Sequence, residues 1–107
     1  MSETSDHPDL IGDIDRLIHE PARYNIVALL YVLRSADFRF VQHQTGLTAG
    51  NLSAHLRKLK SAGYLKIDKG FSGNFPHTDL SLTAAGRRSF EKYRDRMKQA
   101  LDSLPEK

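Results

Sequence analysis

The sequence contains no cysteine among its 107 residues. A disulfide framework, a thiolate nucleophile and a cysteine-ligated zinc or iron–sulfur centre are therefore excluded. Long hydrophobic runs are also lacking: the longest, from Ile26 to Leu33, is far shorter than the roughly 20 residues that span a bilayer. The first nine residues, MSETSDHPD, are polar and acidic, which is unlike a signal peptide. We therefore expect a cytoplasmic protein without a membrane segment.

Motifs of catalysis and metal binding are missing as well. No two of the five histidines have the spacing of a helical metal site, and no H-E-x-x-H motif occurs (His7, His19, His43, His55, His77). There is no G-x-S-x-G nucleophile motif, and the GFSG run at residues 70–73 is too short to cradle a phosphate. We expect neither an enzyme nor a metal site nor a bound cofactor.

The charge that is present is divided unevenly along the chain. The whole sequence has 16 Lys+Arg against 13 Asp+Glu, a formal net charge of +3. Residues 1–50 have four basic and seven acidic side chains, and residues 51–107 have twelve basic and six acidic. The two parts therefore differ in sign, −3 against +6, which indicates a polyanion-binding surface in the second part. A chain of this length fits one domain.

Hydrophobic spacing and capping residues predict a mostly helical fold with one small antiparallel hairpin. Residues 1–8 are expected to be a flexible acidic tail, and residues 9–104 to form the domain. Pro21 suits the first turn of a helix, and Asp37, Thr48 and Thr83 are plausible N-caps. The expected helices cover residues 9–19, 21–35, 38–45, 49–62 and 84–104. Strands over 64–69 and 77–82 enclose a seven-residue loop, so the expected order is α-α-α-α-β-β-α.

The helices over 38–45 and 49–62 form a helix-turn-helix, because a glycine turn separates them. In the second of these helices, Leu52, Leu56 and Leu59 share one face and are expected to pack inward. Small, polar or basic side chains occupy the opposite arc, which suits close approach to a DNA groove: Gly50, Asn51, Ser53, Ala54, Arg57, Lys58 and Ser61. The alternative is an ordinary solvated surface helix, but the immediate hairpin favours DNA binding.

The stretch FRFVQHQTGLTAGNLSAHLRKLKSAGYL at residues 38–65 resembles the core of a MarR/ArsR-like winged-helix transcriptional regulator. The stretch KGFSGNFPHTDLSLTAAG at residues 69–86 is similar to the wing of small stand-alone members, and PARYNIVALLYVL fits their second helix. The resemblance implies a dimeric regulator of double-stranded DNA whose recognition helix enters the major groove. By position it implies a set of DNA-facing residues on that helix: Thr48, Asn51, Ser53, Ala54, Arg57 and Lys58.

The hairpin would then be the wing, with Lys60, Lys66, Lys69, Asn74 and His77 near the DNA backbone. This sequence departs from similar proteins at the wing tip, where Lys or Arg is common. Here Asn74, Phe75 and His77 stand in those places. Phe71 and Phe75 have two interpretations. They could insert as wedges at a base step of DNA, or they could pack against the wing stem or a partner subunit. We favour packing.

The last helix has an apolar side at approximately heptad spacing, and the helix over 9–19 has another. These faces either pack within the domain or pair with a second copy, and we favour a two-fold dimer. The expected interface residues are Leu10, Ile14, Leu17, Phe90, Tyr93, Met97, Leu101 and Leu104. A winged-helix module that binds proteins instead of DNA is the rival interpretation. No cluster of residues identifies a small-molecule effector.

Overall fold

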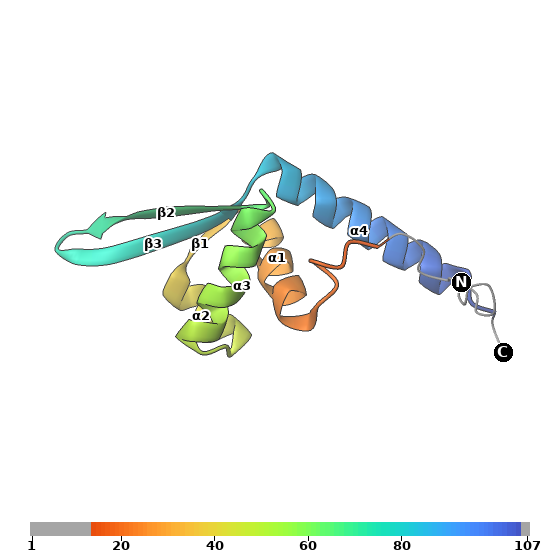
Figure 1. Ribbon diagram of the computed structural model, residues 1–107, viewed down its shortest axis with the longest axis horizontal. Coiled ribbons are helices and arrows are strands. Elements are labelled where there is room, and N and C mark those ends of the chain that lie inside the picture. The colour runs from red at the N-terminus through yellow and green to blue at the C-terminus, as the bar shows by residue number, and fades with distance from the viewer. Residues whose placement is uncertain (1–13, 106–107) are drawn as a thin grey trace.

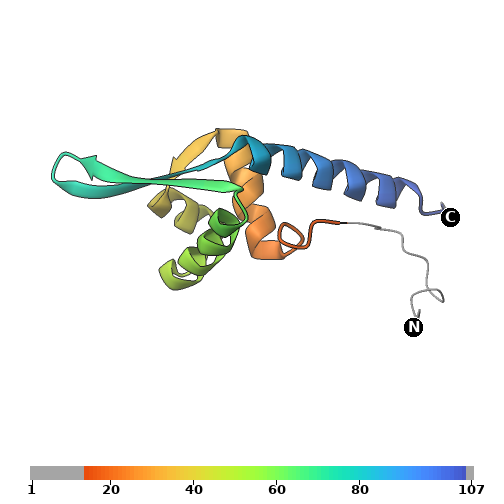
Figure 2. The same cartoon turned by 45° about the horizontal axis from the view of Figure 1, so that its top comes forward.

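The computed structural model describes residues 14–105. Its elements are α1 (Pro21–Leu33), β1 (Ser35–Asp37), α2 (Phe38–Thr45), α3 (Ala49–Ser61), β2 (Leu65–Ser72), β3 (Phe75–Leu82) and α4 (Ala84–Asp102). Figures 1 and 2 show helices α1 to α3 gathered in a body, from which the β2–β3 hairpin and α4 extend in opposite directions. The expected class, a mostly helical winged helix with a small antiparallel sheet, is confirmed.

The helix starts follow the capping residues in the sequence. Asp37, Thr48 and Thr83 each accept a hydrogen bond from the backbone N–H three residues later, as N-caps do. Glu20 caps α1 in the same way, by accepting from the N–H of Arg23. Helix α2 ends at Gly46, whose φ of +74° is a left-handed conformation that glycine adopts without strain. Local sequence therefore sets these helix ends.

The expected helix over residues 9–19 is wrong for its described part. Residues 16–20 form a turn and a bend, because the Asp15 carboxylate accepts hydrogen bonds from the N–H groups of Leu17 (2.9 Å) and Ile18 (3.3 Å). Such side-chain bonds compete with the helical ladder. Residues 9–13 and the expected tail lie outside the described residues.

The sheet has three antiparallel strands in the order β1-β3-β2, so the expected order of elements lacked one strand. Strand β1 is only three residues long, and it forms by pairing with β3, with Ala36 opposite Leu80. The hairpin differs too: the expected seven-residue loop at 70–76 is wrong. Pairing continues to Ser72 opposite Phe75, which leaves Gly73 and Asn74 as the turn. Gly73 has a φ of +65°, and such a two-residue turn with glycine first matches the twist of the strands. The wing is therefore longer than expected.

The core is built around α1, where Ile26, Val27 and Leu30 are fully buried. Leu52, Leu56 and Leu59 pack from α3, and Leu65 and Leu80 from the inner face of the sheet. Of the helices in the described part, none is long and apolar enough to cross a membrane.

A small joint connects the end of α3, the wing and α4. The Thr83 hydroxyl donates to the Gly63 carbonyl (2.6 Å), and the Thr83 N–H donates to the Tyr64 carbonyl (3.0 Å). One turn into α4, Gly86 lies so close that a Cβ there would overlap the same Tyr64 carbonyl oxygen. The Thr-x-x-Gly stretch of the sequence therefore fixes the direction in which α4 leaves the body.

Candidate nucleic-acid interface

Helix α3 presents two different faces. Leu52, Leu56 and Leu59 are buried against the core, as expected. Asn51, Arg57 and Lys58 are exposed, whereas Ser53 and Ala54 are half-buried. Thr48 caps the helix, because its hydroxyl accepts from the N–H of Asn51 at 3.1 Å. The N-terminal N–H groups and helix dipole favour an anion near this end.

A cleft of about 740 Å³ separates α3 from the inner face of the hairpin. From α3 come Ser53, Arg57 and Lys60, which share a flank because they are three or four residues apart. Lys69 and Thr78 face them as cross-strand partners in β2 and β3. The floor is apolar, formed by Phe38, Leu56, Ile67 and Leu80. Three cations from two elements therefore border one cleft whose lining includes no carboxylate.

The structure separates the other expected wing residues from this cleft. Lys66 and His77 lie on the opposite face of the ribbon, since their positions alternate with those of Ile67 and Thr78. There Lys66 Nζ lies 3.6 Å from an Asp68 carboxylate oxygen, and His77 Nε2 lies 2.9 Å from Asp79 Oδ1. Asn74 is in the turn at the end of the wing.

Two groups of residues in this region were missed by sequence reasoning. Phe38 and Thr78 line the cleft, but only the pairing of strands across the sheet brings them there. His55 lies half-buried on α3, and no motif in the sequence marks it. Its Nδ1 accepts a hydrogen bond from the Arg23 guanidinium at 3.2 Å, and Arg23 also donates to the Leu17 carbonyl at 2.6 Å. This contact connects α3 to α1, and sequence spacing contains no signal for it.

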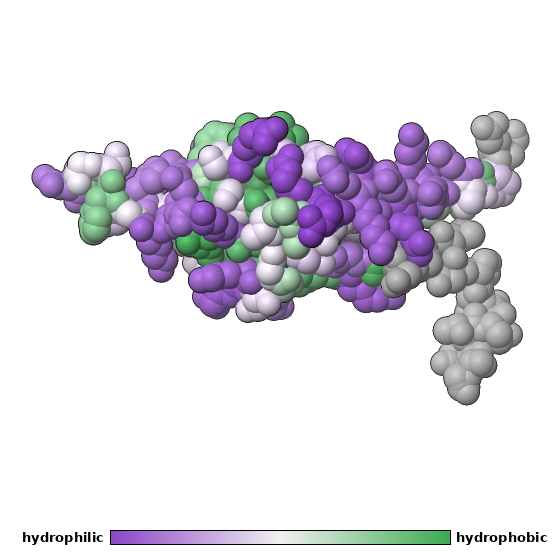
Figure 3. Space-filling view, turned by 90° about the horizontal axis from the view of Figure 1, so that it is seen from above, coloured by the Kyte–Doolittle hydropathy of each residue, from purple (hydrophilic) through white to green (hydrophobic). Residues whose placement is uncertain are grey.

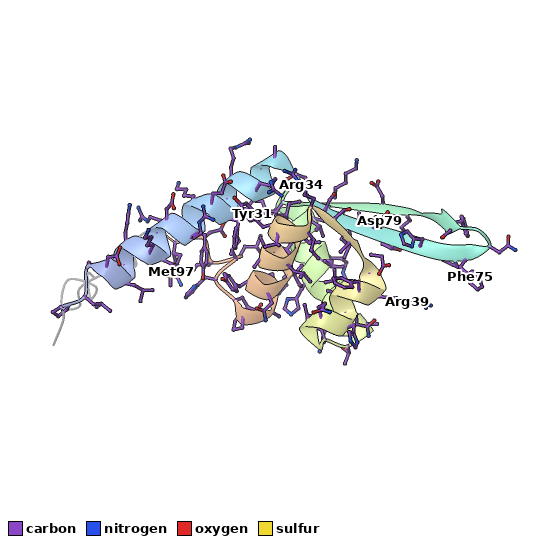
Figure 4. All side chains as sticks on the ribbon, turned by 180° about the vertical axis from the view of Figure 1, so that it is seen from behind. Tyr31, Arg34, Arg39, Phe75, Asp79 and Met97 are labelled. Atoms are coloured by element: carbon purple, nitrogen blue, oxygen red, sulfur yellow. The ribbon has the colours of Figure 1, made fainter. Side chains whose placement is uncertain are left out.

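The expected dimer residues divide into two groups. Ile14, Phe90 and Tyr93 are at most 9% exposed, so they belong to the core of this chain. Leu17 is half-buried against that core, and Leu10 lies outside the described residues. Further along α4, Met97 is half-buried, while Leu101 and Leu104 are 63% and 44% exposed. Figure 4 shows Met97 on the part of α4 that extends from the body.

Aromatic and cationic side chains attach α4 to α1. Tyr31 donates a hydrogen bond to Glu91 at 2.6 Å, and this bond raises the pKa of the Tyr31 hydroxyl. The guanidinium carbon of Arg87 lies 4.4 Å from the centre of the Tyr31 ring, and the same side chain donates to the Tyr31 carbonyl at 3.2 Å. Tyr64 lies against Gly86 of α4. The pKa of its hydroxyl is raised mainly by burial, and further by the hydrogen bond that it donates to Asp15. Both hydroxyls therefore stay neutral near pH 7.

The described residues include no cluster of three or more His, Asp or Glu side chains that could hold a metal ion. A capped helix with a polar outer face, a glycine turn before it and an antiparallel wing after it define a winged helix-turn-helix. The chain belongs to the family of winged helix DNA-binding domains, which it matches over residues 22–101.

The chain is also similar to individual proteins. An uncharacterized protein of Methanocaldococcus jannaschii is 32% identical over 78 residues, which are 73% of this chain and 85% of that protein. The transcriptional regulator homologue protein from Pyrococcus horikoshii has a TM-score of 0.81 at 26% identity, with 99% of this chain and 100% of that chain covered. Reduced AbfR bound to DNA has a TM-score of 0.65 at 14% identity, with 85% and 64% covered, and shares the fold. AbfR is a MarR-family regulator, and the resemblance to small winged-helix regulators is confirmed.

Proposed function

We propose that this protein is a homodimeric, sequence-specific regulator of transcription that binds double-stranded DNA in the cytoplasm. Helix α3 enters the major groove, and the β2–β3 hairpin is the wing. The observation that carries this proposal is the cleft in which Arg57 and Lys60 of α3 face Lys69 of β2 without a carboxylate in the lining. A phosphate backbone is a linear polyanion, and cations on both sides of a cleft suit it.

The exposed side chains of α3 have separate roles in this proposal. Arg57, Lys60 and Lys69 contact phosphates, because they border the cleft. Asn51 and Ser53 contact base edges, because amide and hydroxyl groups can donate to and accept from the polar atoms of bases in the major groove. Arg57 and Lys58 enlarge the same base-contacting surface of α3. Ala54 is small enough to let the helix approach the bases, and Thr48 fixes where the helix starts. Asn74 contacts DNA from the wing turn, whereas Lys66 and His77, on the other ribbon face, have a lesser role.

A second copy covers the distal part of α4. Met97 and Leu101 are four residues apart on α4, and they border a groove of about 420 Å³ whose lining also includes Tyr24 and Phe90. Leu104, which is 44% exposed, follows just after the end of the helix. Burying this stripe against the same stripe of a partner removes apolar surface from water. A two-fold pair of this kind also places two α3 helices for successive major grooves, about 34 Å apart.

The test is a titration of fluorescein-labelled duplex by fluorescence anisotropy over a series of salt concentrations. We expect binding by the unaltered protein. The double substitution Arg57→Ala/Lys60→Ala should weaken it and flatten the log–log salt slope by about two units, since each lost phosphate contact removes about 0.9. Absence of duplex binding by the unaltered protein at low salt contradicts the proposal.

The matched control is Arg88→Ala/Lys92→Ala, which removes two exposed cations from α4. The change in net charge is the same, so long-range electrostatics alone predicts the same loss. We expect the control to keep the slope of the unaltered protein. Equal flattening in both variants contradicts the assignment to α3.

One observation favours the alternative of a module that binds proteins rather than DNA. Val32, Leu33 and Phe40, near the two ends of β1, are 75%, 42% and 42% exposed. Exposed apolar side chains are typical of contact surfaces where they form one patch. The anisotropy titration separates the two functions, because a module of this kind shows no affinity for random duplex.

A further inference from the structure

The end of the wing presents two aromatic side chains to solvent. Phe71 and Phe75 are each 76% exposed, more than any other large apolar side chain in residues 14–105. The expectation that they pack against the wing stem is therefore wrong. Figure 3 shows apolar side chains near the end of the wing, beside hydrophilic neighbours. A solvated aromatic pair at the end of an arm requires an explanation other than folding.

The strand register places the two rings on opposite faces of the ribbon. Phe71 is opposite Pro76, and Phe75 is opposite Ser72, and cross-strand partners share a face. The two-residue turn Gly73–Asn74 is all that lies beyond them. Figure 4 shows Phe75 at the far end of the ribbon, away from the helices. Any groove that the ribbon enters end-on therefore meets an aromatic ring on each side of a narrow tip.

The charge of the wing changes along its length. Residues 69–78 contain a lysine and a histidine but no acidic side chain. Immediately below them Asp68 and Asp79 face each other across the strands, on the ribbon face opposite the cleft. The end of the wing approaches a phosphate backbone without charge repulsion, whereas the outer face of the stem does not.

We propose that Phe71 and Phe75 are DNA contacts, which the wing inserts as apolar wedges at a base step of the minor groove. This inference depends on the proposed function. In a duplex each phosphate backbone separates the major groove from a minor groove. With α3 in the major groove and the backbone in the cleft, the ribbon end lies over the neighbouring minor groove. Phenylalanine is among the side chains that wedge between base steps there.

The test uses an alternating dA-dT duplex with 2-aminopurine at its flexible TA steps, because unstacking raises the emission of this base. We expect the unaltered protein to raise the emission. Phe71→Ala/Phe75→Ala should abolish the rise and weaken binding by about tenfold or more, as loss of aromatic–base stacking does. Because the rings are uncharged, the loss should be the same factor at every salt concentration, with the salt slope unchanged.

Two further variants keep the outcome clear. Phe71→Leu/Phe75→Leu should keep part of the emission rise, because leucine is also a wedging side chain. Val32→Ala removes an equally exposed apolar side chain from α1 and should bind like the unaltered protein. The melting temperature of each variant shows that it is folded.

The failures differ from one another. If the unaltered protein binds duplex and the alanine pair binds equally well, the wedge is overturned while the proposed function stands. A flattened salt slope in the alanine pair overturns it too, since an uncharged contact cannot produce that change. If the alanine pair changes the sedimenting mass instead of the affinity, the rings contact a second copy and the DNA assignment is overturned. Absence of duplex binding by the unaltered protein overturns the proposed function and this inference together.

Discussion

The wing and α4 are two arms that leave one joint in opposite directions, yet their positive charges serve different purposes (Figure 1). Beside the wing, Arg57, Lys60 and Lys69 border an open cleft, and their side chains form no hydrogen bond or ion pair with another described residue. On α4, Arg87 contacts the ring and the carbonyl of Tyr31. The cations beside the wing are thus available to an external anion, whereas Arg87 stabilises the fold.

The comparison shows why net charge alone does not locate a binding surface. Six basic residues lie on α4, more than on α3, but Glu91, Asp95 and Asp102 accompany them on the same helix. Helix α3 contains no acidic residue at all. The distribution of carboxylates, rather than the number of cations, distinguishes the two helices.

The joint between the arms is where the largest effect is expected. Gly86→Ala places a methyl group against the Tyr64 carbonyl, which is backbone and cannot move aside as a side chain does. We expect a loss of about 2–3 kcal/mol in the free energy of unfolding. This exceeds the gain of about 1 kcal/mol that alanine has over glycine in a helix interior. Urea denaturation followed by circular dichroism measures it.

The control for this substitution is Gly50→Ala in α3. It is the same change in a helix, but a Cβ at Gly50 has no atom within 4 Å. We expect unchanged or slightly increased stability. Equal destabilisation at both positions contradicts the role of close packing at the joint.

The proposed role of α4 in dimerisation can be tested with substitutions that leave the wing unchanged. Met97→Asp/Leu101→Asp places two charges on the apolar stripe, and we expect sedimentation at micromolar concentration to show half the mass of the unaltered protein. Affinity for a duplex with two half-sites should fall by about a hundredfold, because binding of the two copies is no longer coupled. Gln99→Asp/Ser103→Asp adds the same charges on the opposite side of α4 and should leave the mass unchanged. A monomeric unaltered protein contradicts the proposed dimer.

The smallest effects are expected from two single substitutions, one arginine from each region. Arg87→Ala should lower the melting temperature by about 4 °C, the size typical of one lost hydrogen bond in a small domain, and leave the salt slope of DNA binding unchanged. Arg57→Ala should leave the melting temperature unchanged and flatten the salt slope. Its side chain is exposed and has no partner among residues 14–105. Thermal melts and anisotropy titrations of both variants check the prediction. If Arg57→Ala lowers the melting temperature as much as Arg87→Ala, the distinction between the two regions is wrong.

Much of the helical framework was predictable because its signals are local. A capping side chain such as Thr48 or Thr83 acts on an N–H three residues away, and Gly46 ends α2 through its own φ. The inward leucines of α3 follow from helical periodicity, and they also define its outer face. The elements that were predicted wrongly depend on partners distant in sequence, or on competition between local hydrogen bonds. Strand β1 exists through β3, and the Asp15 carboxylate replaces a helical turn with side-chain hydrogen bonds.

By itself, the sequence determined the winged helix-turn-helix class, the limits of α2 and α3, and the polar arc of α3, because these depend on contacts within a few residues. Only the tertiary structure decided which cations meet. Strand pairing places Lys69 beside Arg57 and moves Lys66 to the other face, since side chains alternate along a strand. Pairing up to Phe75 likewise turned an expected loop into a ribbon with an aromatic ring on each face. Register is a property of two strands together, so neither strand alone encodes it.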